Sequence, residues 1–430
     1  MTAVTSLSPV ADPQRWPSVA TAPQARVAGA IAHQLFKGAI RKVGVRVVLP
    51  NGEIMGRARV GDPEMRLIRP QVFFARLGAD LRIGFGEAYL AGDWTPGPST
   101  DLADLLAPFA ARMSELVPQA LQRLRPLVDK AMPGHELNTV AGARTNIERH
   151  YDLSNELFGA FLDPTMSYSA ARFPDVVRSP ADLDLEAGQL RKIDSVLDYA
   201  RVGPGTRLLE IGTGWGALAL RAAQRGARVT SVTISSEQLE LARRRIDAAG
   251  MSDRVELRLQ DYRQVQGSFD AVVSVEMIEA VGERFWPTYF ATLDRVLAPG
   301  GRVALQAITM EHHRMLATRQ SYGWIQKYIF PGGLIPSLQA ISDNLRQHTH
   351  LEVVERRELG WHYAETLRQW RSRFLDNWGQ VADLGFDETF RRMWEFYLGY
   401  CEAGFRTGYL GVSQLAIGRR PDLGPAHRHR

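Results

Sequence analysis

The feature that most constrains this chain is a regular alternation of strand-like and helix-like segments after residue 180. Short apolar runs alternate with amphipathic stretches, and glycines end several of these stretches. The expected strands are 207–212, 228–235, 255–262, 269–278 and 301–310, and the expected helices are 182–202, 216–226, 236–250 and 285–297. Strands separated by helices predict an α/β fold, in which helices cover both faces of a parallel, doubly wound sheet.

A chain of 430 residues has room for a second domain before this sheet. Alternation around "PNGE" predicts a hairpin there, within a small α+β unit. Shifts in composition and pattern divide the chain into a disordered leader over 1–25, an α+β domain over 26–130, a linker over 131–145, the α/β domain over 146–418 and a disordered tail over 419–430.

An amphipathic helix is predicted at the start of the N-terminal domain, over 26–43. Its Lys and Arg side chains fall largely on the side opposite its apolar residues. The apolar face consists of Val27, Ile31, Leu35, Phe36 and Ile40. We expect this face to pack on its own domain, with an interfacial membrane helix as the alternative.

The chain's whole net charge of +5 lies in its first 149 residues, which hold 18 Lys and Arg against 13 Asp and Glu, whereas the remainder holds 34 of each. This asymmetry fits an anionic partner, either phospholipid or nucleic acid, and equally an ordinary solvated face. A single cysteine, Cys401, excludes an internal disulfide and indicates a reducing compartment. We expect neither a signal peptide nor a membrane-spanning helix.

A glycine-rich turn follows the first expected strand of the α/β domain, in "EIGTGWG". Glycines at such a turn let the backbone bend sharply and approach a ligand closely. The spacing Gly212-x-Gly214-x-Gly216 differs from the G-x-G-x-x-G of dinucleotide sites. The pattern E-x-G-x-G-x-G resembles the first motif of class I S-adenosylmethionine (SAM) methyltransferases. That resemblance implies that Glu210 accepts a hydrogen bond near the methionine ammonium of SAM.

The next strand ends also carry polar side chains. Thr233 and Gln238 follow the second expected strand, and Asp261 and Tyr262 follow the third. Because the carboxyl ends of parallel strands share one edge of a sheet, these groups suit a cofactor held there. The acidic residue that usually binds the ribose is missing after the second strand. No residue spacing predicts a metal site.

Three further stretches make the resemblance specific, namely "HYDLSNELFGAFLDPTMSYSAARF", "VSVEMIEAVGERFWPTYF" and "YIFPGGLIPS". In order and spacing they resemble the cyclopropane-fatty-acyl-phospholipid synthase family, which includes mycolic-acid cyclopropane synthases and fatty-acid 10-methylene transferases. The resemblance covers residues 145–418 strongly and the N-terminal domain more loosely. It implies a lipid-engaging N-terminal domain, and SAM as the methyl donor for the cis double bond of an acyl chain.

The implied chemistry begins with attack of the alkene on the methyl group of SAM, which leaves a carbocation. Loss of a proton from the new methyl closes a cyclopropane ring. A hydride shift before that proton loss gives an exocyclic methylene instead. Both outcomes need a base in an apolar pocket that excludes water. The family resemblance implies that this base is a bound bicarbonate.

The resemblance also implies which positions hold the bicarbonate. Glu279 in "MIEAVG" keeps the family glutamate, and Ile308 in "LQAIT" keeps the family isoleucine. The usual cysteine is Ala170, which leaves a backbone N–H, and the usual histidine is Gln306, which can still donate one hydrogen bond. Tyr363 in "WHYAETL" matches the family tyrosine.

For SAM, the resemblance extends to Tyr168 and Ser169 in "MSYSA", in addition to the residues named for the strand ends. Cys401 matches a cysteine long suspected to be catalytic in the family. Because the alkene attacks SAM directly, we expect Cys401 to be a buried structural residue. Glu276 is expected to cap a helix or to pair locally. His150 and Tyr151 are expected either to lie beside the cofactor or simply to begin a helix.

The prediction is therefore a SAM-dependent methyltransferase that makes cyclopropane chains from unsaturated phospholipids. A 10-methylene product is the alternative within the same class, and the changes at Ala170 and Gln306 favour it. The expected location is the cytoplasmic face of the cell membrane, bound peripherally to anionic lipid. A homodimer is left open, and nucleic acid is not expected as a partner. A nucleic-acid methyltransferase and a non-catalytic lipid-binding protein are the alternatives from other classes.

Overall fold

The computed structural model of the chain describes residues 11–56, 59, 61–113 and 154–420. The predicted linker, the positions of His150 and Tyr151, and most of the predicted tail lie outside these residues. The chain divides into two compact units. The first consists of 1–131, 321–329 and 370–409, and the second of 132–320, 330–369 and 410–430.

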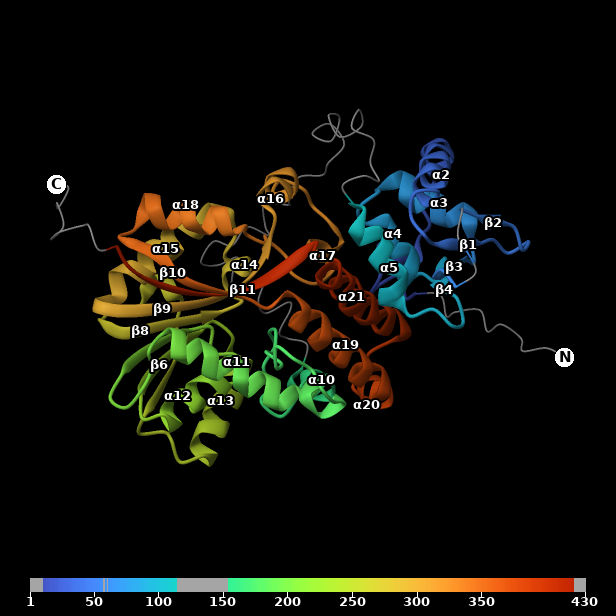
Figure 1. Cartoon of the computed structure of the whole chain (residues 1–430). Helices are drawn as coiled ribbons and strands as arrows, with labels where there is room; N and C mark the ends of the chain where they lie inside the picture. Colours follow the sequence, from blue (N-terminus) through green and yellow to red (C-terminus); the bar gives the residue numbers. More distant parts are fainter. Residues whose placement is uncertain (1–10, 57–58, 60, 114–153, 421–430) are drawn as a thin grey trace. The chain divides into compact units, whose positions relative to one another are not determined.

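The second unit is built on a seven-stranded sheet in the order β10-β11-β9-β8-β5-β6-β7 (Figure 1). Its strands are β5 (Arg207–Ile211), β6 (Arg228–Thr233), β7 (Val255–Leu259), β8 (Phe269–Val275), β9 (Leu297–Met310), β10 (Leu351–Glu358) and β11 (Leu410–Arg419). Neighbours from β7 to β9 pair in parallel, whereas β11 pairs antiparallel with both β9 and β10. This arrangement is the predicted doubly wound α/β sheet with an antiparallel end, which is the class I methyltransferase fold.

Helices cover both faces of this sheet because its central strands are apolar on both sides. In β5, Leu208 and Leu209 point to opposite faces and join two separate buried clusters. The helices of this unit are α10 (Asn155–Phe161), α11 (Leu185–Tyr199), α12 (Ala217–Gln224), α13 (Ser236–Ala248), α14 (Ile278–Val281), α15 (Trp286–Val296), α16 (His312–Thr318), α18 (Leu338–His348) and the first part of α19 (Gly360–Asp376).

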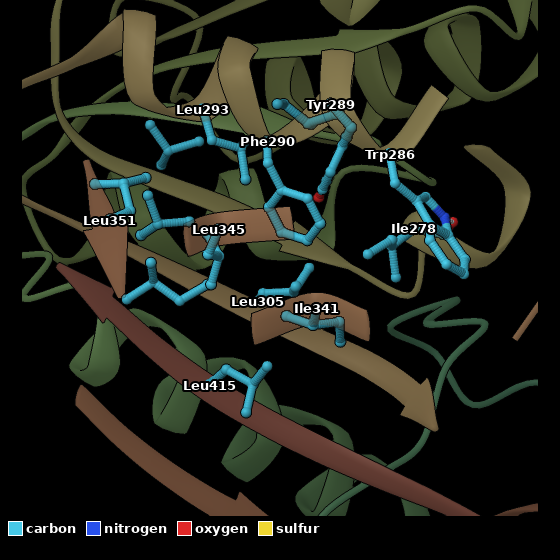
Figure 2. Packing of buried hydrophobic residues seen from close by; sticks show 14 of the residues in the cluster. Ile278, Trp286, Tyr289, Phe290, Leu293, Leu305, Ile341, Leu345, Leu351 and Leu415 are labelled. Atoms are coloured by element: carbon cyan, nitrogen blue, oxygen red, sulfur yellow. Dashed lines mark hydrogen bonds between the residues drawn. The ribbon is translucent and has the colours of Figure 1, made fainter. Parts of the chain in front are cut away.

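One of the two buried clusters lies under α15 and α18 (Figure 2). Trp286, Tyr289, Phe290 and Leu293 recur at helical spacing along α15, so all four face the sheet. They meet Leu305 of β9 and apolar side chains of α18. The same cluster holds the short helix α14, through its buried Ile278 and Val281.

The first unit contains a four-stranded sheet in the order β2-β1-β3-β4, with helices packed beside it. The strands are β1 (Arg46–Val48), β2 (Ile54–Met55), β3 (Glu64–Leu67) and β4 (Trp94–Pro96). The helices are α1 (Pro17–Ala20), α2 (Arg26–Ile40), α3 (Pro70–Ala79), α4 (Gly84–Leu90), α5 (Leu102–Ala111), α17 (Trp324–Tyr328), α20 (Trp378–Asp383) and α21 (Glu388–Arg406).

The division of the chain differs from the predicted one, because two later segments belong to the first unit. Arg371 lies between Asp101, at 2.8 Å, and Glu402 of α21, at 3.0 Å. Lys327 of α17 donates to Glu87 of α4 at 2.5 Å. Helix α21 buries one apolar face, and the sequence pattern does not say which element covers that face.

The predicted disordered leader is also partly wrong. Residues 11–25 are ordered, and they include the short helix α1. Val19 is buried, and the Trp16 indole donates to the Asp387 carboxylate at 2.8 Å. The sequence does not show that this segment is ordered, because its anchor Asp387 lies far along the chain.

Only part of the expected apolar face of α2 is buried. Gly29, Ala32, Phe36 and Ile40 face inward, and Gly29 lets α2 approach α3 closely. The exposed residues of the face are Val27, Ile31 and Leu35, at 78%, 58% and 41% exposure. The prediction that the whole face packs on its own domain is therefore wrong for these three residues. Within the described residues, no helix is both long and apolar enough to span a membrane.

Candidate active site

A pocket opens at the carboxyl ends of β5, β6 and β8, the edge at which open α/β sheets bind ligands. All nine residues predicted for SAM line it. They are Tyr168, Ser169, Glu210, Gly212, Gly214, Thr233, Gln238, Asp261 and Tyr262. The structure thus brings these residues together from four separate stretches of sequence. Their binding of SAM stays a prediction.

The glycine-rich turn forms the floor of this pocket. Gly212, Gly214 and Gly216 all have left-handed backbone angles, with φ of 96°, 51° and 86°. A Cβ on Gly212 would lie 2.6 Å from Met277 Cγ, so this position has no space for a side chain. Gly216 begins α12, whose first N–H groups face the same loop.

Glu210 lies one residue before the end of β5, with its side chain buried beside the pocket. Ser231 Oγ donates to Glu210 Oε2 at 2.6 Å, and Thr213 holds Ser231 at 2.7 Å. Burial raises the pKa of the Glu210 carboxyl to about 8. A cationic ligand beside this carboxyl would favour its charged form, as the ammonium of SAM requires.

Most of the polar residues after β6 and β7 are held in place by hydrogen bonds and an ion pair within the chain. Thr233 Oγ1 donates to Gln238 Oε1 at 3.2 Å. Asp261 accepts from the backbone N–H of Arg263 and forms an ion pair with its guanidinium at 2.6 Å. Tyr262 has a buried hydroxyl without a hydrogen-bond partner in the described part of the chain. Burial raises the pKa of Tyr262 to about 12, so it is a neutral donor.

Lys192 is a pocket residue that the sequence analysis missed. It lies on α11, is almost completely buried, and donates to Ser169 Oγ at 2.5 Å. Burial lowers the pKa of the ammonium to about 8, against the opposing pull of Glu276 and other carboxylates. The signal was present, since Gln189, Lys192 and Ser195 place polar groups on the buried face of a helix at intervals of three residues.

Three of the five predicted bicarbonate residues, Ala170, Gln306 and Tyr363, contact a carboxylate of the chain itself. Glu276 directly follows β8, and its Oε1 accepts from the Ala170 N–H at 2.9 Å and from Gln306 Nε2 at 2.8 Å. Tyr363 is a further hydrogen-bonding neighbour of this carboxylate. The expectation that Glu276 caps a helix or pairs locally is wrong, because its partners lie far away in sequence.

Gln306 is held in one orientation by a chain of buried polar groups. Its Oε1 accepts from Gln414 Nε2 at 2.9 Å, so its amide nitrogen is directed toward Glu276. Gln414 in turn accepts from Ser195 Oγ at 2.6 Å, and Arg357 donates to Ser195 at 2.7 Å. This arrangement makes Gln306 a donor at the site, as predicted from its replacement of histidine.

Glu279 lies on α14 and does not line the pocket. Its Oε1 accepts a short hydrogen bond from the Ile308 N–H. Its Oε2 is buried and has no hydrogen-bond partner in the described residues. Burial and the nearby Glu276 raise the pKa of Glu279 to about 8.

These contacts bear on the predicted bicarbonate. Its expected donors from Ala170, Gln306 and Tyr363 already bind the Glu276 carboxylate. A second anion at the same position would lie against two carboxyl groups, and like charges at close range are unfavourable. The residues present therefore do not fit a bicarbonate at this position. Among the described residues, no cluster of His, Cys, Asp or Glu suits a metal ion.

Cys401 lies on α21 in the first unit, whereas the pocket belongs to the second. Cys401 is partly exposed rather than fully buried as expected, but loss of solvation at its thiol raises the pKa to about 12, so the group stays protonated at neutral pH. This protonation fits the structural role expected for Cys401.

Comparison with known proteins places these features in a family. The family model described as Mycolic acid cyclopropane synthetase matches residues 139–415. The tuberculostearic acid methyltransferase UfaA1 of Mycobacterium tuberculosis is 52% identical over 424 residues, which cover 97% of this chain and 99% of the relative. The cyclopropane-fatty-acyl-phospholipid synthase of Escherichia coli is 34% identical over 388 residues, or 87% of this chain and 91% of the relative.

Two solved structures from the same family are also similar. The cyclopropane synthase MmaA2 from Mycobacterium tuberculosis has a TM-score of 0.58 and 30% identity, and the match covers 64% of this chain and 97% of that one. The mycolic acid cyclopropane synthase CmaA1, complexed with S-adenosylhomocysteine (SAH) and CTAB, has a TM-score of 0.58 and 29% identity, covering 67% and 99%.

Proposed function

Because this chain belongs to the mycolic acid cyclopropane synthetase family and is a SAM-dependent methyltransferase, we propose that it methylates the cis double bond of an unsaturated acyl chain in a membrane phospholipid. The product we propose is the 10-methylene chain, a methyl-branched precursor, rather than the cyclopropane expected by default. The observation that carries this choice is the match to a tuberculostearic acid methyltransferase along nearly the whole of both chains.

The pocket residues would bind SAM, and the site must also hold the alkene for methyl transfer. Gly212 and Gly214 would give the amino-acid part of SAM close access to the backbone, and Glu210 would face its ammonium. Thr233, Gln238 and Tyr262 lie where the ribose and adenine would bind. An alkene is a weak nucleophile, so methyl transfer requires that it be held in line with the methyl–sulfonium bond. Water must also be kept away from the resulting cation.

Changes at the reacting end of the pocket support a product other than the ring. Ala170 and Gln306 replace the cysteine and histidine that the family resemblance implies, and Glu276 reaches between them. A hydride shift takes place only if the cation survives long enough before its proton is removed. The position of the base relative to the cation therefore governs which product forms.

The first unit supports a role at the lipid surface. Val27, Ile31 and Leu35 form an exposed apolar stripe along α2, and exposed Lys37 and Arg41 lie at the end of the same helix. A helix with apolar side chains toward acyl chains and cations toward anionic headgroups suits an interfacial position. We propose peripheral binding to anionic membrane through this stripe.

The test uses the full-length purified protein, SAM and vesicles of dioleoyl phosphatidylglycerol. Released acyl chains are analysed by gas chromatography with mass spectrometry, and the product by proton NMR. We expect acyl chains heavier by one CH₂ unit that carry the signals of an exocyclic methylene. Ring protons without alkene signals would reject the 10-methylene product in favour of a cyclopropane. Absence of any acyl product from oleoyl vesicles would reject the substrate class, and saturated vesicles serve as the negative control.

A further inference from the structure

We propose that the Glu276 carboxylate is the base that deprotonates the methylated acyl chain, and that it replaces an external bicarbonate. This inference rests on the proposed methylation of an acyl double bond, but not on which of the two products forms. It assigns a catalytic role to a residue that the sequence analysis expected to be only structural.

The first support is the set of groups that hold Glu276. The Ala170 N–H and the Gln306 amide donate to the same oxygen, Oε1, at 2.9 and 2.8 Å, and Tyr363 is a third hydrogen-bonding neighbour. These are three of the five positions that the family resemblance assigns to bicarbonate. A carboxylate and a bicarbonate present the same planar pair of oxygens and the same single charge. The side chain of Glu276 therefore satisfies donors that a bound anion would satisfy.

The second support is the local backbone. Glu276 has φ of 51°, the left-handed conformation that residues other than glycine rarely adopt. Such a conformation costs on the order of 1 kcal/mol and persists where the surrounding structure requires it. The backbone N–H of Glu276 donates to the Gln306 carbonyl at 2.7 Å, which holds the strained residue at the end of β8. With this backbone conformation, the Glu276 carboxylate lies within hydrogen-bond distance of Ala170 and Gln306.

The third support is that the Glu276 carboxylate adjoins both the predicted SAM residues and the predicted bicarbonate residues. Glu276 lines the same pocket as the nine predicted SAM residues. Burial raises the pKa of the Glu276 carboxyl, whereas the two hydrogen-bond donors and the buried Lys192 ammonium favour its charged form. Gln414 donates to the amide oxygen of Gln306, so the amide N–H of Gln306 points toward Glu276. This donor needs an acceptor, which the Glu276 carboxylate provides. The site thus holds Glu276 ready to accept a proton.

The step balances without an added reactant. The alkene π pair forms the new C–C bond to the methyl carbon, and the C–S bond of SAM breaks with its electron pair on sulfur, giving SAH. A hydride shift moves the positive charge to the carbon that bears the new methyl. A methyl C–H bond then breaks, its electron pair forms the exocyclic C=C bond, and the proton passes to Glu276. Without the hydride shift, the same electron pair closes the ring, so the base is needed in either case.

The test compares the wild-type chain with Glu276→Gly, Glu276→Gln and the control Glu240→Gln. Glu240 is exposed on α13. Glycine suits the left-handed backbone and opens the space that the carboxylate fills, whereas glutamine keeps that space filled. SAH release from oleoyl vesicles is measured at saturating SAM, in buffer purged of carbon dioxide and in buffer with added bicarbonate.

We expect wild type and Glu240→Gln to be equally active in both buffers. In purged buffer, Glu276→Gly and Glu276→Gln should lose roughly 100-fold or more, the usual contribution of a general base. Bicarbonate should restore Glu276→Gly by roughly tenfold or more and leave Glu276→Gln inactive. Loss of wild-type activity on purging, or failure of bicarbonate to rescue Glu276→Gly, would overturn the proposal.

A second readout separates this inference from the proposed function. Line broadening of ¹³C-bicarbonate in NMR should show binding to Glu276→Gly and none to wild type, whatever the acyl substrate is. If no unsaturated vesicle supports SAH release, the proposed substrate fails, while the binding result still decides whether Glu276 occupies the anion position. Bicarbonate binding to wild type with equal affinity would reject the replacement.

Discussion

At the scale of single residues, buried ionisable groups dominate this site. Glu210, Glu279 and Lys192 all have pKa values moved to about 8, in each case chiefly because burial disfavours the charged form. Groups with such perturbed pKa values cluster at functional sites more than elsewhere. Two of these groups, Glu210 and Lys192, line the candidate pocket, which supports its assignment as the active site.

Glu279 gives a prediction for stability against pH. A carboxyl group whose pKa is raised on folding stabilises the protein below its ordinary pKa, and this contribution is lost as pH rises through the folded value. The free energy of unfolding of the wild type should therefore fall, relative to Glu279→Gln, by up to about 1.4 kcal/mol per unit between about pH 5 and about pH 8. Thermal unfolding of the ligand-free proteins across this range measures the difference.

The comparison isolates Glu279 because other titrating groups, such as His362, are shared by both proteins. Glu240→Gln, on an exposed helix surface, should follow the wild type at every pH. Parallel curves for wild type and Glu279→Gln would contradict a raised pKa at this position.

At the scale of elements, the loop between β5 and α12 is the most constrained part of the pocket. Three of its residues have left-handed angles, and a Cβ added to one of them, Gly212, would collide with the Met277 side chain. Gly205 has a similar φ of 79°, but nothing lies within 4 Å of a Cβ built there. The two positions thus separate backbone strain from steric exclusion.

Gly212→Ala should weaken SAM binding strongly, whereas Gly205→Ala should not. Both substitutions add the cost of a left-handed alanine, about 1 kcal/mol, but Gly212→Ala also forces Met277 and the loop apart. We expect SAM affinity to fall at least about tenfold for Gly212→Ala, which corresponds to about 1.4 kcal/mol. Isothermal titration with SAM measures it, and equal affinities for the two variants would show that the loop adapts freely.

At the scale of the whole molecule, the first unit draws on segments from both ends of the chain. Helix α21 and residues 321–329 belong with the N-terminal elements, although they are encoded inside the region that the family model matches. Arg371 and Glu402 are buried together, and Asp101 is a second carboxylate partner of Arg371. The N-terminal region is therefore part of the fold around α21, not an appended module.

Deletion of residues 1–131 should accordingly damage the remaining protein. It would expose the apolar face of α21 and remove the Asp101 carboxylate from the buried Arg371, and breaking such a buried ionic group costs on the order of 3 kcal/mol. We expect aggregation, or a loss of cooperative unfolding, in size-exclusion chromatography and calorimetry. A monodisperse truncated protein that unfolds cooperatively and binds SAM would show that the C-terminal segments fold independently.

Much of this protein is determined by its sequence alone. The period of its apolar residues, its glycine turns and the polar groups at three strand ends specify the α/β sheet and the SAM pocket, because backbone geometry and strand direction follow from local pattern. The family resemblance drawn from short motifs is confirmed by the match over residues 139–415. These features follow from residues that lie close together in the chain, so the local sequence pattern is enough to predict them.

The tertiary structure decided what depends on distant partners. Glu276 lies next to Ala170, Gln306 and Tyr363 only because β8, β9 and α19 converge in the fold. The partner of α21 and the anchoring of residues 11–25 were likewise set by contacts across hundreds of positions. Such contacts form when the chain closes long loops, and no local propensity encodes which surfaces then meet.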